Sequence, residues 1–303
     1  MKMLPWRISG ARLQLPRDLE VTYVLGRMGA ATVTDTYRLW FGSPHTARFG
    51  FGRLVRLGLL RSFPRQDPLS PAWFSLTARA VEWVAEEAGC DPRELRALAG
   101  VRNFNLPALS ARNRLWTSLM LACRSQPSVG IVIFQPEWEL RPMKSGSVPV
   151  IPDAITVLEN KDVTDVRPRA WILEMDTGSE RSAVWKSKAS KYAELRGRGP
   201  LYGLGEWRLV ALVPSLRRAH TVAKAVVSGG GGAFTFLGVI SALENGRAFS
   251  RVLYPAPVIA SSVTVNPSAS LVDELAPPIS EADQQPRPTG DRGLSSETGR
   301  ISL

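Results

Sequence analysis

Apolar residues near the start of the chain recur at helical spacing, with polar or glycine-containing breaks between the segments. This pattern predicts a first helix over Arg17–Met28 that stops near Gly29, and a short second helix that Thr34 caps and that runs through Trp40. Residues 42–44 (Gly-Ser-Pro) then break the pattern. A third helix follows, so three helices are predicted before any strand.

The third predicted helix covers residues 45–61 and is basic. Its spacing places Leu54, Leu57 and Leu60 on one face. Basic side chains point to the other faces, and such a helix can enter the major groove of DNA, because arginine contacts both phosphates and base edges. The residues predicted to contact DNA are His45, Arg48, Arg53 and Arg56. The alternative left open is that these arginines form a solvated face and that the helical unit only mediates dimer or protein contacts.

A β-hairpin is predicted after the basic helix. Residues 61–63 form its first strand, a proline-rich turn follows, and residues 73–76 return as the second strand. Thr77 then caps a final helix that ends towards Gly89. Helix, helix, basic helix and hairpin is the order of a winged helix-turn-helix, so residues 17–95 are predicted to be a DNA-binding domain of that kind.

From about residue 104 the pattern changes to alternating helices and strands. Helices are predicted over residues 106–123 and 180–196, and strands over residues 129–134, 153–158, 170–176 and 207–213. In chain order these elements are αβββαβ, the core arrangement of restriction-endonuclease-like folds. The predicted fold class is therefore α/β, with the winged helix followed by a domain of this type over residues 96–257.

Glycine-rich and proline-rich segments mark the C-terminal part of the chain. SGGGG after Val227 is predicted to be a flexible joint, because it lacks the Gly-Lys-Ser/Thr ending of a phosphate-binding loop. Residues 234–237 and 251–254 are expected to pack back onto the domain. Residues 258–303 are rich in Pro, Ser, Glu and Asp, so this tail is predicted to be disordered because it cannot bury enough apolar surface.

The charge of the chain favours a phosphate-rich partner. Its 303 residues carry a formal net charge of +11, with a pI near 10.2. Positive potential of this size favours nucleic acid, here double-stranded DNA, when no membrane signal accompanies it. Neither Cys90 nor Cys123 has the spacing of a zinc site or a disulfide framework. No signal peptide or membrane-spanning run is recognisable, so a cytoplasmic protein without membrane contact is expected.

Acidic residues are predicted to gather at one edge of the sheet. Side chains alternate along a strand, so Glu174 and Asp176 point to the same face. Asp153 begins the preceding strand, and a hairpin between the two strands would bring it beside that pair. Two or three carboxylates together with a substrate phosphate satisfy the oxygen preference of Mg²⁺. We therefore predict a Mg²⁺ site in which Asp153, Glu174 and Asp176 are both metal ligands and catalytic residues.

One lysine lies where the helical pattern expects an apolar side chain. Val184, Lys188, Tyr192 and Leu195 form one stripe of the helix over residues 180–196. An inward lysine needs negative charge nearby, and the three predicted acids are the nearest source. Lys188 would then be a fourth catalytic residue that holds the scissile phosphate or helps to orient an attacking water. The alternatives left open are an ion pair that locks the helix onto the sheet, and a side chain that reaches solvent. Tyr192 is expected to pack in the core and not to act as a nucleophile.

Two parts of the chain resemble known families. The run from Trp171 to Leu195, WILEMDTGSERSAVWKSKASKYAEL, resembles the "ExDxGT … K … Y" block of the replication-relaxation family. The residues on matching positions are Asp153, Glu174, Asp176, Lys188 and Tyr192. RLVRLGLLRSF followed by FSLTARAVEWV is similar to the "LxxLGLL … LT" signature of winged-helix regulators. The family resemblance implies an N-terminal winged helix, a domain similar to PD-(D/E)xK nucleases, and a role in replication and relaxation of plasmid or mobile-element DNA.

The sequence leaves three functional hypotheses. The first is a DNA-binding protein of plasmid or mobile-element replication and relaxation that also nicks DNA with Mg²⁺. The second is a non-catalytic accessory protein that works with replication or relaxosome proteins, in which the acidic cluster is structural. The third is a transcriptional regulator that uses only the winged helix. A homodimer is compatible with each hypothesis, and the sequence does not decide whether the protein is an enzyme.

Overall fold

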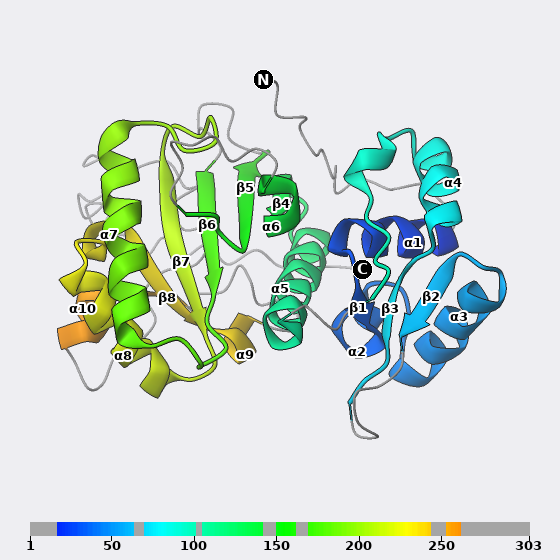
Figure 1. Cartoon of the computed structure of the whole chain (residues 1–303), viewed down its shortest axis with the longest axis horizontal. Helices are drawn as coiled ribbons and strands as arrows, with labels where there is room; N and C mark the ends of the chain where they lie inside the picture. The colour runs from blue at the N-terminus through cyan, green and yellow to red at the C-terminus, as the bar shows by residue number, and fades with distance from the viewer. Residues whose placement is uncertain are drawn as a thin grey trace, which may run out of the picture.

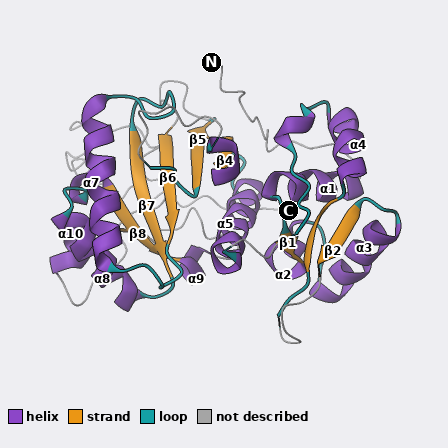
Figure 2. Ribbon diagram, viewed as in Figure 1, coloured by secondary structure: helices purple, strands orange, loops and turns teal. Residues whose placement is uncertain are grey.

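The computed structural model forms two lobes, with the long helix α5 (Leu106–Ser125) between them (Figure 1). The structure describes residues 17–63, 70–100, 105–141, 150–161, 169–243 and 253–261. The N-terminal lobe consists of helices around a small antiparallel sheet, and the second lobe of a larger mixed sheet with helices (Figure 2). The chain is thus a mixed α/β protein, as the sequence predicts. None of the helices in these ranges is long and apolar enough to cross a membrane.

The N-terminal lobe follows the predicted order of helices and hairpin. Its elements are α1 (Arg17–Met28), β1 (Ala31–Thr32), α2 (Val33–Thr36), η1 (Tyr37–Leu39), α3 (Pro44–Arg56), β2 (Leu60–Phe63), β3 (Trp73–Leu76), α4 (Ala78–Ala88) and η2 (Pro92–Glu94). The strands pair antiparallel in the order β1-β3-β2, so the short β1, which the sequence pattern does not predict, adds a strand to the hairpin. The proline-rich turn between β2 and β3 lies outside the described residues.

Capping side chains decide where two helices of this lobe begin. Thr77 caps α4, and Gly89 ends it in the left-handed region with φ 65°, both as predicted. The second helix begins earlier than predicted, because its cap is Thr32 and not Thr34. The hydroxyl of Thr32 and the carboxylate of Asp35 form a reciprocal capping box.

The basic helix α3 ends sooner than the sequence pattern predicts. Phe51 and Leu54 are buried against the rest of the lobe, whereas Leu57 is 59% exposed. The prediction that Leu57 shares the buried face with Leu54 is therefore wrong. The reason is that α3 stops at Arg56 and the backbone turns through Gly58, whose φ of 73° suits glycine, into β2.

The second lobe contains the predicted αβββαβ order, with one short helix inserted after the first strand and further elements at the end. After α5 come β4 (Val129–Pro136), α6 (Glu137–Leu140), β5 (Ala154–Asn160), β6 (Arg169–Met175), α7 (Ser182–Arg198), β7 (Trp207–Val213), α8 (Leu216–Ser228), η3 (Gly232–Phe234), β8 (Thr235–Val239), α9 (Ile240–Leu243), β9 (Leu253–Pro255) and α10 (Ala256–Ser261). In the described ranges the strands form one sheet in the order β4-β5-β6-β7-β8-β9. The pairs β6-β7 and β7-β8 are parallel, and the other pairs are antiparallel.

Different helices cover the two faces of the large sheet. α7, α8 and α10 lie on one face, and α5 lies on the other (Figure 1). Trp116 of α5 stacks on Phe134 of β4 with ring centroids 4.7 Å apart. Along β6 the side chains alternate, so Trp171 and Leu173 join the core under α5 while Ile172 packs under α7. This alternation decides which face the acidic residues of β6 take.

Helix α5 joins the two lobes through polar and apolar contacts. The side-chain amide of Asn113 donates a hydrogen bond to the carbonyl of Ala30 at 2.7 Å, and Arg112 donates one to the carbonyl of Met28 at 3.0 Å. One hydrophobic cluster also runs from α1 through α5 to the large sheet. The lobes therefore share a core at this helix, and the division of the chain at residues 95 and 96 stays a prediction.

The structure differs in part from two predictions for the C-terminal part. The SGGGG segment is not a flexible joint at its start, because Gly229 is buried and a Cβ there would lie 2.5 Å from the carbonyl oxygen of Lys186. Only glycine therefore lets α7 and α8 approach this closely. The chain also stays ordered beyond residue 257, because α10 continues to Ser261 and buries Ile259. The rest of the predicted tail, residues 262–303, lies outside the described residues.

Candidate functional site

The end of β6 presents two carboxylates to α7. Glu174 accepts hydrogen bonds from Lys188 and Tyr192 on that helix. Asp176, which directly follows the strand, accepts one from the indole of Trp185 on the same helix. Both carboxylates therefore lie on one face of the sheet, as the alternation of side chains along a strand predicts.

Both carboxylate oxygens of Glu174 have partners in a buried environment. Glu174 is 2% exposed, the Lys188 ammonium lies 2.9 Å from Oε2, and the Tyr192 hydroxyl lies 2.5 Å from Oε1. Burial and the nearby Asp153 raise the pKa of Glu174 and Lys188 lowers it, so that its pKa is about 7 overall. Near neutral pH this carboxyl group is therefore balanced between its protonated and ionised forms. Tyr192 is buried, as expected, but it also orients Glu174.

Lys188 points inward, as the stripe of α7 predicts. Its ammonium forms ion pairs with Glu174 at 2.9 Å and with Glu180 at 2.8 Å, and it lies 5.2 Å from the centre of the Trp185 ring. Burial lowers the pKa of Lys188, but the two carboxylates outweigh burial and raise the pKa overall, so the side chain stays charged. The sequence pattern places Glu180 at the start of this helix and does not indicate it as a partner of Lys188, whereas in the structure it lies in the loop before α7. Val184 is 43% exposed, so its predicted place in the buried stripe is wrong.

Asp153 lies beside this pair, directly before β5. The antiparallel register of β5 and β6 brings it to the end of β6, where its Oδ2 accepts a hydrogen bond from the backbone N–H of Met175 at 2.6 Å. Burial raises the pKa of Asp153, while the Met175 N–H and the charge of Lys188 lower it. Asp153 also acts on the pKa of Glu174. The structure thus brings Asp153, Glu174 and Lys188 together, and we call these three residues the lysine cluster.

Asp176 belongs to a different set of contacts. It is completely buried, and its Oδ2 accepts hydrogen bonds from the Trp185 indole at 2.9 Å and from Nε of Arg218 at 2.7 Å. Its Oδ1 accepts a hydrogen bond from the backbone N–H of Gly178 at 2.6 Å. Arg218 comes from the first turn of α8, and the sequence pattern does not connect it with β6. The cation that neutralises Asp176 is therefore an arginine, and not Lys188.

In this arrangement the carboxylates do not fit the predicted Mg²⁺ ion. No group of three acidic, histidine or cysteine side chains within the described ranges is placed to hold a metal ion. Both oxygens of Glu174 and of Asp176 already accept hydrogen bonds, and Arg218 neutralises Asp176. Mg²⁺ needs oxygen ligands in near-octahedral geometry. Binding of Mg²⁺ by Asp153, Glu174 and Asp176 stays a prediction, and it requires Lys188 and Arg218 to give up these contacts.

A cavity of about 580 Å³ lies next to the lysine cluster, where the two lobes meet. Its charged lining residues are Arg96, Arg112, Glu137, Arg141, Asp153, Glu180 and Lys188. Arg112 is buried, and burial lowers its pKa to about 10 although Asp153 raises it. The guanidinium therefore stays charged at neutral pH. The cavity thus holds three arginine side chains and one ammonium group together with three carboxylates, of which Glu137 pairs with Arg141. This lining leaves an excess of one positive charge, which suits an anionic ligand.

The residues predicted to contact DNA lie on the exposed side of α3. His45, Arg48 and Arg56 are exposed, and the sequence of α3 contains no acidic residue. Arg53 is also exposed, but its guanidinium forms an ion pair with Asp18 of α1. Arg53 therefore also ties α3 to α1, which the sequence pattern does not indicate.

An aromatic side chain lies among these basic residues. Phe49 is 66% exposed, and its ring meets that of His45 edge-on with centroids 4.8 Å apart. An apolar side chain on a major-groove helix suits contact with the methyl group of thymine. The sequence does not distinguish Phe49 from the buried Phe51 two residues later, because only the packing of α3 decides which of them is exposed.

Comparison with protein-family models decides the family. The replication-relaxation model matches residues 23–204, which is more than half of the 303 residues. The chain belongs to the replication-relaxation family. In this replication-relaxation protein the match covers α3 and the whole lysine cluster, whereas Arg218 and the rest of α8 follow it. Neither the curated proteins nor the solved structures contain a match to the chain.

Proposed function

We propose that this replication-relaxation protein binds double-stranded DNA and that its N-terminal lobe is a winged helix-turn-helix whose α3 enters the major groove. The observation that carries the proposal is the exposed side of α3, which presents His45, Arg48 and Arg56 together with Phe49, in a helix without a carboxylate. Cations on such a face neutralise phosphates and position the helix on the duplex. The DNA would be that of a plasmid or mobile element, and replication or relaxosome proteins would be the partners.

Loss of positive charge from α3 is expected to weaken DNA binding. We expect the double variant Arg48→Gln with Arg56→Gln to bind a labelled duplex about tenfold more weakly at about 0.1 M salt, and to lower the slope of log affinity against log salt by about 2. Fluorescence anisotropy over a salt series measures both quantities. The matched control is Lys161→Gln with Lys191→Gln, which removes two exposed cations from the other lobe. An α3 variant that behaves like this control would contradict the proposal.

Cleavage of one DNA strand is a second candidate function. The observation that favours it is the meeting of Asp153, Glu174 and Lys188 beside a cavity lined by arginine side chains. The strands and helices that hold these residues follow the αβββαβ order of PD-(D/E)xK nucleases, and we propose that the second lobe has this fold. Burial raises the pKa of both carboxyl groups, and Asp153 also raises that of Glu174, so these two carboxyl groups can exchange protons near neutral pH more readily than exposed ones.

A nicking assay separates cleavage from a non-catalytic accessory role. Supercoiled plasmid is incubated with the protein and Mg²⁺ or Mn²⁺, and open-circular DNA is measured on a gel. If the protein cleaves DNA, the wild type should nick the plasmid in a metal-dependent way. The nicking rate of Asp153→Asn should be at least about a hundredfold lower, which is on the order of the usual contribution of one catalytic group. Glu194→Gln removes an exposed carboxylate of α7 and is the control. Wild-type protein that binds the plasmid but does not nick it would favour the accessory role.

A further inference from the structure

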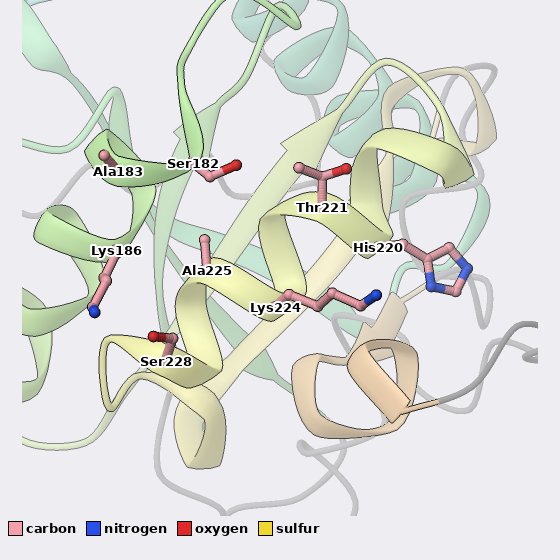
Figure 3. A pocket seen from close by; sticks show the side chains of 8 residues that line it. All are labelled: Ser182, Ala183, Lys186, His220, Thr221, Lys224, Ala225 and Ser228. Carbon is pink, nitrogen blue, oxygen red and sulfur yellow. The ribbon is translucent and has the colours of Figure 1, made fainter.

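A groove of about 410 Å³ runs between α7 and α8 on the face of the large sheet opposite α5. Figure 3 shows Ser182 and Lys186 on the α7 side, and Thr221 and Lys224 on α8. The other lining residues are Ala183, His220, Ala225 and Ser228. The family match ends at residue 204, before α8, so this groove lies partly outside it. We call it the α7–α8 groove.

The α7–α8 groove is positively charged and has few acidic side chains around it. Lys186 and Lys224 are exposed, and within the described part of the chain neither forms an ion pair. The sequence of α8 contains no acidic residue, and Arg217 adds another exposed cation at its start. The acidic residue of α7, Glu194, lies about two turns beyond Lys186 and pairs with Arg198. An anion in the groove would therefore meet cations that no neighbouring carboxylate neutralises.

The first turn of α7 adds hydrogen-bond donors to the same place. Arg181 precedes the helix, and its side chain makes no capping hydrogen bond. The backbone N–H groups of Ser182 and Ala183 therefore lack partners within the helix, and both residues line the groove. The Ser182 hydroxyl lies beside them (Figure 3). Backbone N–H groups at a helix start, hydroxyls and lysines are the groups that contact phosphate oxygens in nucleic-acid complexes.

We propose that the α7–α8 groove binds the phosphodiester backbone of DNA as a contact surface separate from α3. The ammonium ends of Lys186 and Lys224 lie apart, on different sides of the groove (Figure 3), which suits successive phosphates along a strand better than one phosphate ion. Backbone contacts carry no base information, so binding here is independent of sequence. The inference rests on the proposed function because it takes DNA as the ligand. It does not depend on the role of α3, because α3 and α8 lie at opposite ends of the molecule (Figure 1).

The test compares charge-neutralised variants of the full chain. We expect Lys186→Gln with Lys224→Gln to bind a fluorescein-labelled duplex of about 40 base pairs roughly tenfold more weakly at about 0.1 M salt, with a salt slope lower by about 2. The loss should be equal for two unrelated duplex sequences. Lys161→Gln with Lys191→Gln is the control of equal charge, and thermal melting checks that each variant is folded. A single strand of the same sequence, as a second probe, shows which form of DNA the groove prefers.

The outcomes separate the groove from the proposed function. A groove variant that binds both probes like the control overturns the inference, whatever the α3 variant does. If the groove variant loses affinity while Arg48→Gln with Arg56→Gln does not, the inference stands and the role of α3 is wrong. Wild-type protein that binds neither probe overturns both proposals. A loss confined to one of the two duplex sequences also contradicts the inference, because backbone contacts cannot distinguish them.

Discussion

Replacement of Arg218 by methionine is expected to lower the free energy of unfolding by about 3–5 kcal/mol, the usual effect of leaving a buried charge without its partner. Asp176 is completely buried, and Arg218 contacts its Oδ2 through two nitrogens, each at 2.7 Å. Methionine keeps much of the length of the side chain but removes the charge and the hydrogen bonds. The carboxylate would then keep the Trp185 indole and one backbone N–H as donors. Urea unfolding followed by tryptophan fluorescence measures the loss.

Two further variants test the cause of this loss. Arg217→Met removes the exposed neighbouring cation and should change stability by less than about 0.5 kcal/mol. Asp176→Asn combined with Arg218→Met removes both charges of the pair, and it should be more stable than Arg218→Met alone because no unpaired charge stays buried. A double variant less stable than Arg218→Met would show that the Asp176 carboxylate stabilises the protein through its hydrogen bonds from Gly178 and Trp185 even without the arginine.

Replacement of Lys188 by methionine is expected to destabilise the protein in a pH-dependent way. At about pH 8 the loss should be up to about 3 kcal/mol, because Glu174 without its cation must either stay ionised in a buried site or take up a proton that the unfolded chain does not hold. Burial already raises the pKa of Glu174 to about 7 from 4.5, and Lys188 is a group that lowers it, so the variant should have a still higher pKa. The native state then takes up a proton more readily than the unfolded chain. The loss should therefore be small near pH 4.5 and grow as the pH rises through about 7.

Urea unfolding at several pH values checks this dependence. Glu174→Gln combined with Lys188→Met should restore most of the stability at about pH 8, because the buried group is then neutral at every pH. Lys191→Met, on the exposed side of α7, serves as the control for losing a lysine. A loss of equal size at acidic and alkaline pH would show that Lys188 stabilises the helix by packing and not through the charge of Glu174.

The two clusters around β6 bear differently on catalysis. Asp176 has an arginine, an indole and a backbone N–H as partners, which is the environment of a structural carboxylate. The lysine cluster lies beside the cavity between the lobes, where a ligand can reach Asp153 and Lys188. A variant of Asp176 therefore tests stability first, whereas Asp153→Asn is the sharper test of cleavage. The sequence pattern alone does not separate Asp176 from the other two acids.

The elements that were predictable are those with a strong local signal. Helix α4 begins after Thr77 and ends at Gly89 as expected, because a capping hydroxyl and a left-handed glycine affect the backbone only within a few residues. The same local reasoning placed the cap of the second helix at Thr34 and not at Thr32, since both residues are capable caps and only the position of Asp35 in the first turn distinguishes them. It also extends α3 from Arg56 to residue 61, because an apolar residue in register, such as Leu57, looks the same whether or not the helix continues.

The sequence by itself determined the order of helices and strands, the shared face of Glu174 and Asp176, and the inward direction of Lys188, because each depends on the regular spacing of side chains along one element. Only the tertiary structure decided which cation pairs with each of the two carboxylates. Lys188 and Glu174 are 14 positions apart, and Arg218 and Asp176 are 42 apart. No periodicity spans such distances, so only the packing of α7 and α8 on the sheet brings Glu174 a lysine and Asp176 an arginine. The same packing of α7 against α8 makes the groove between them.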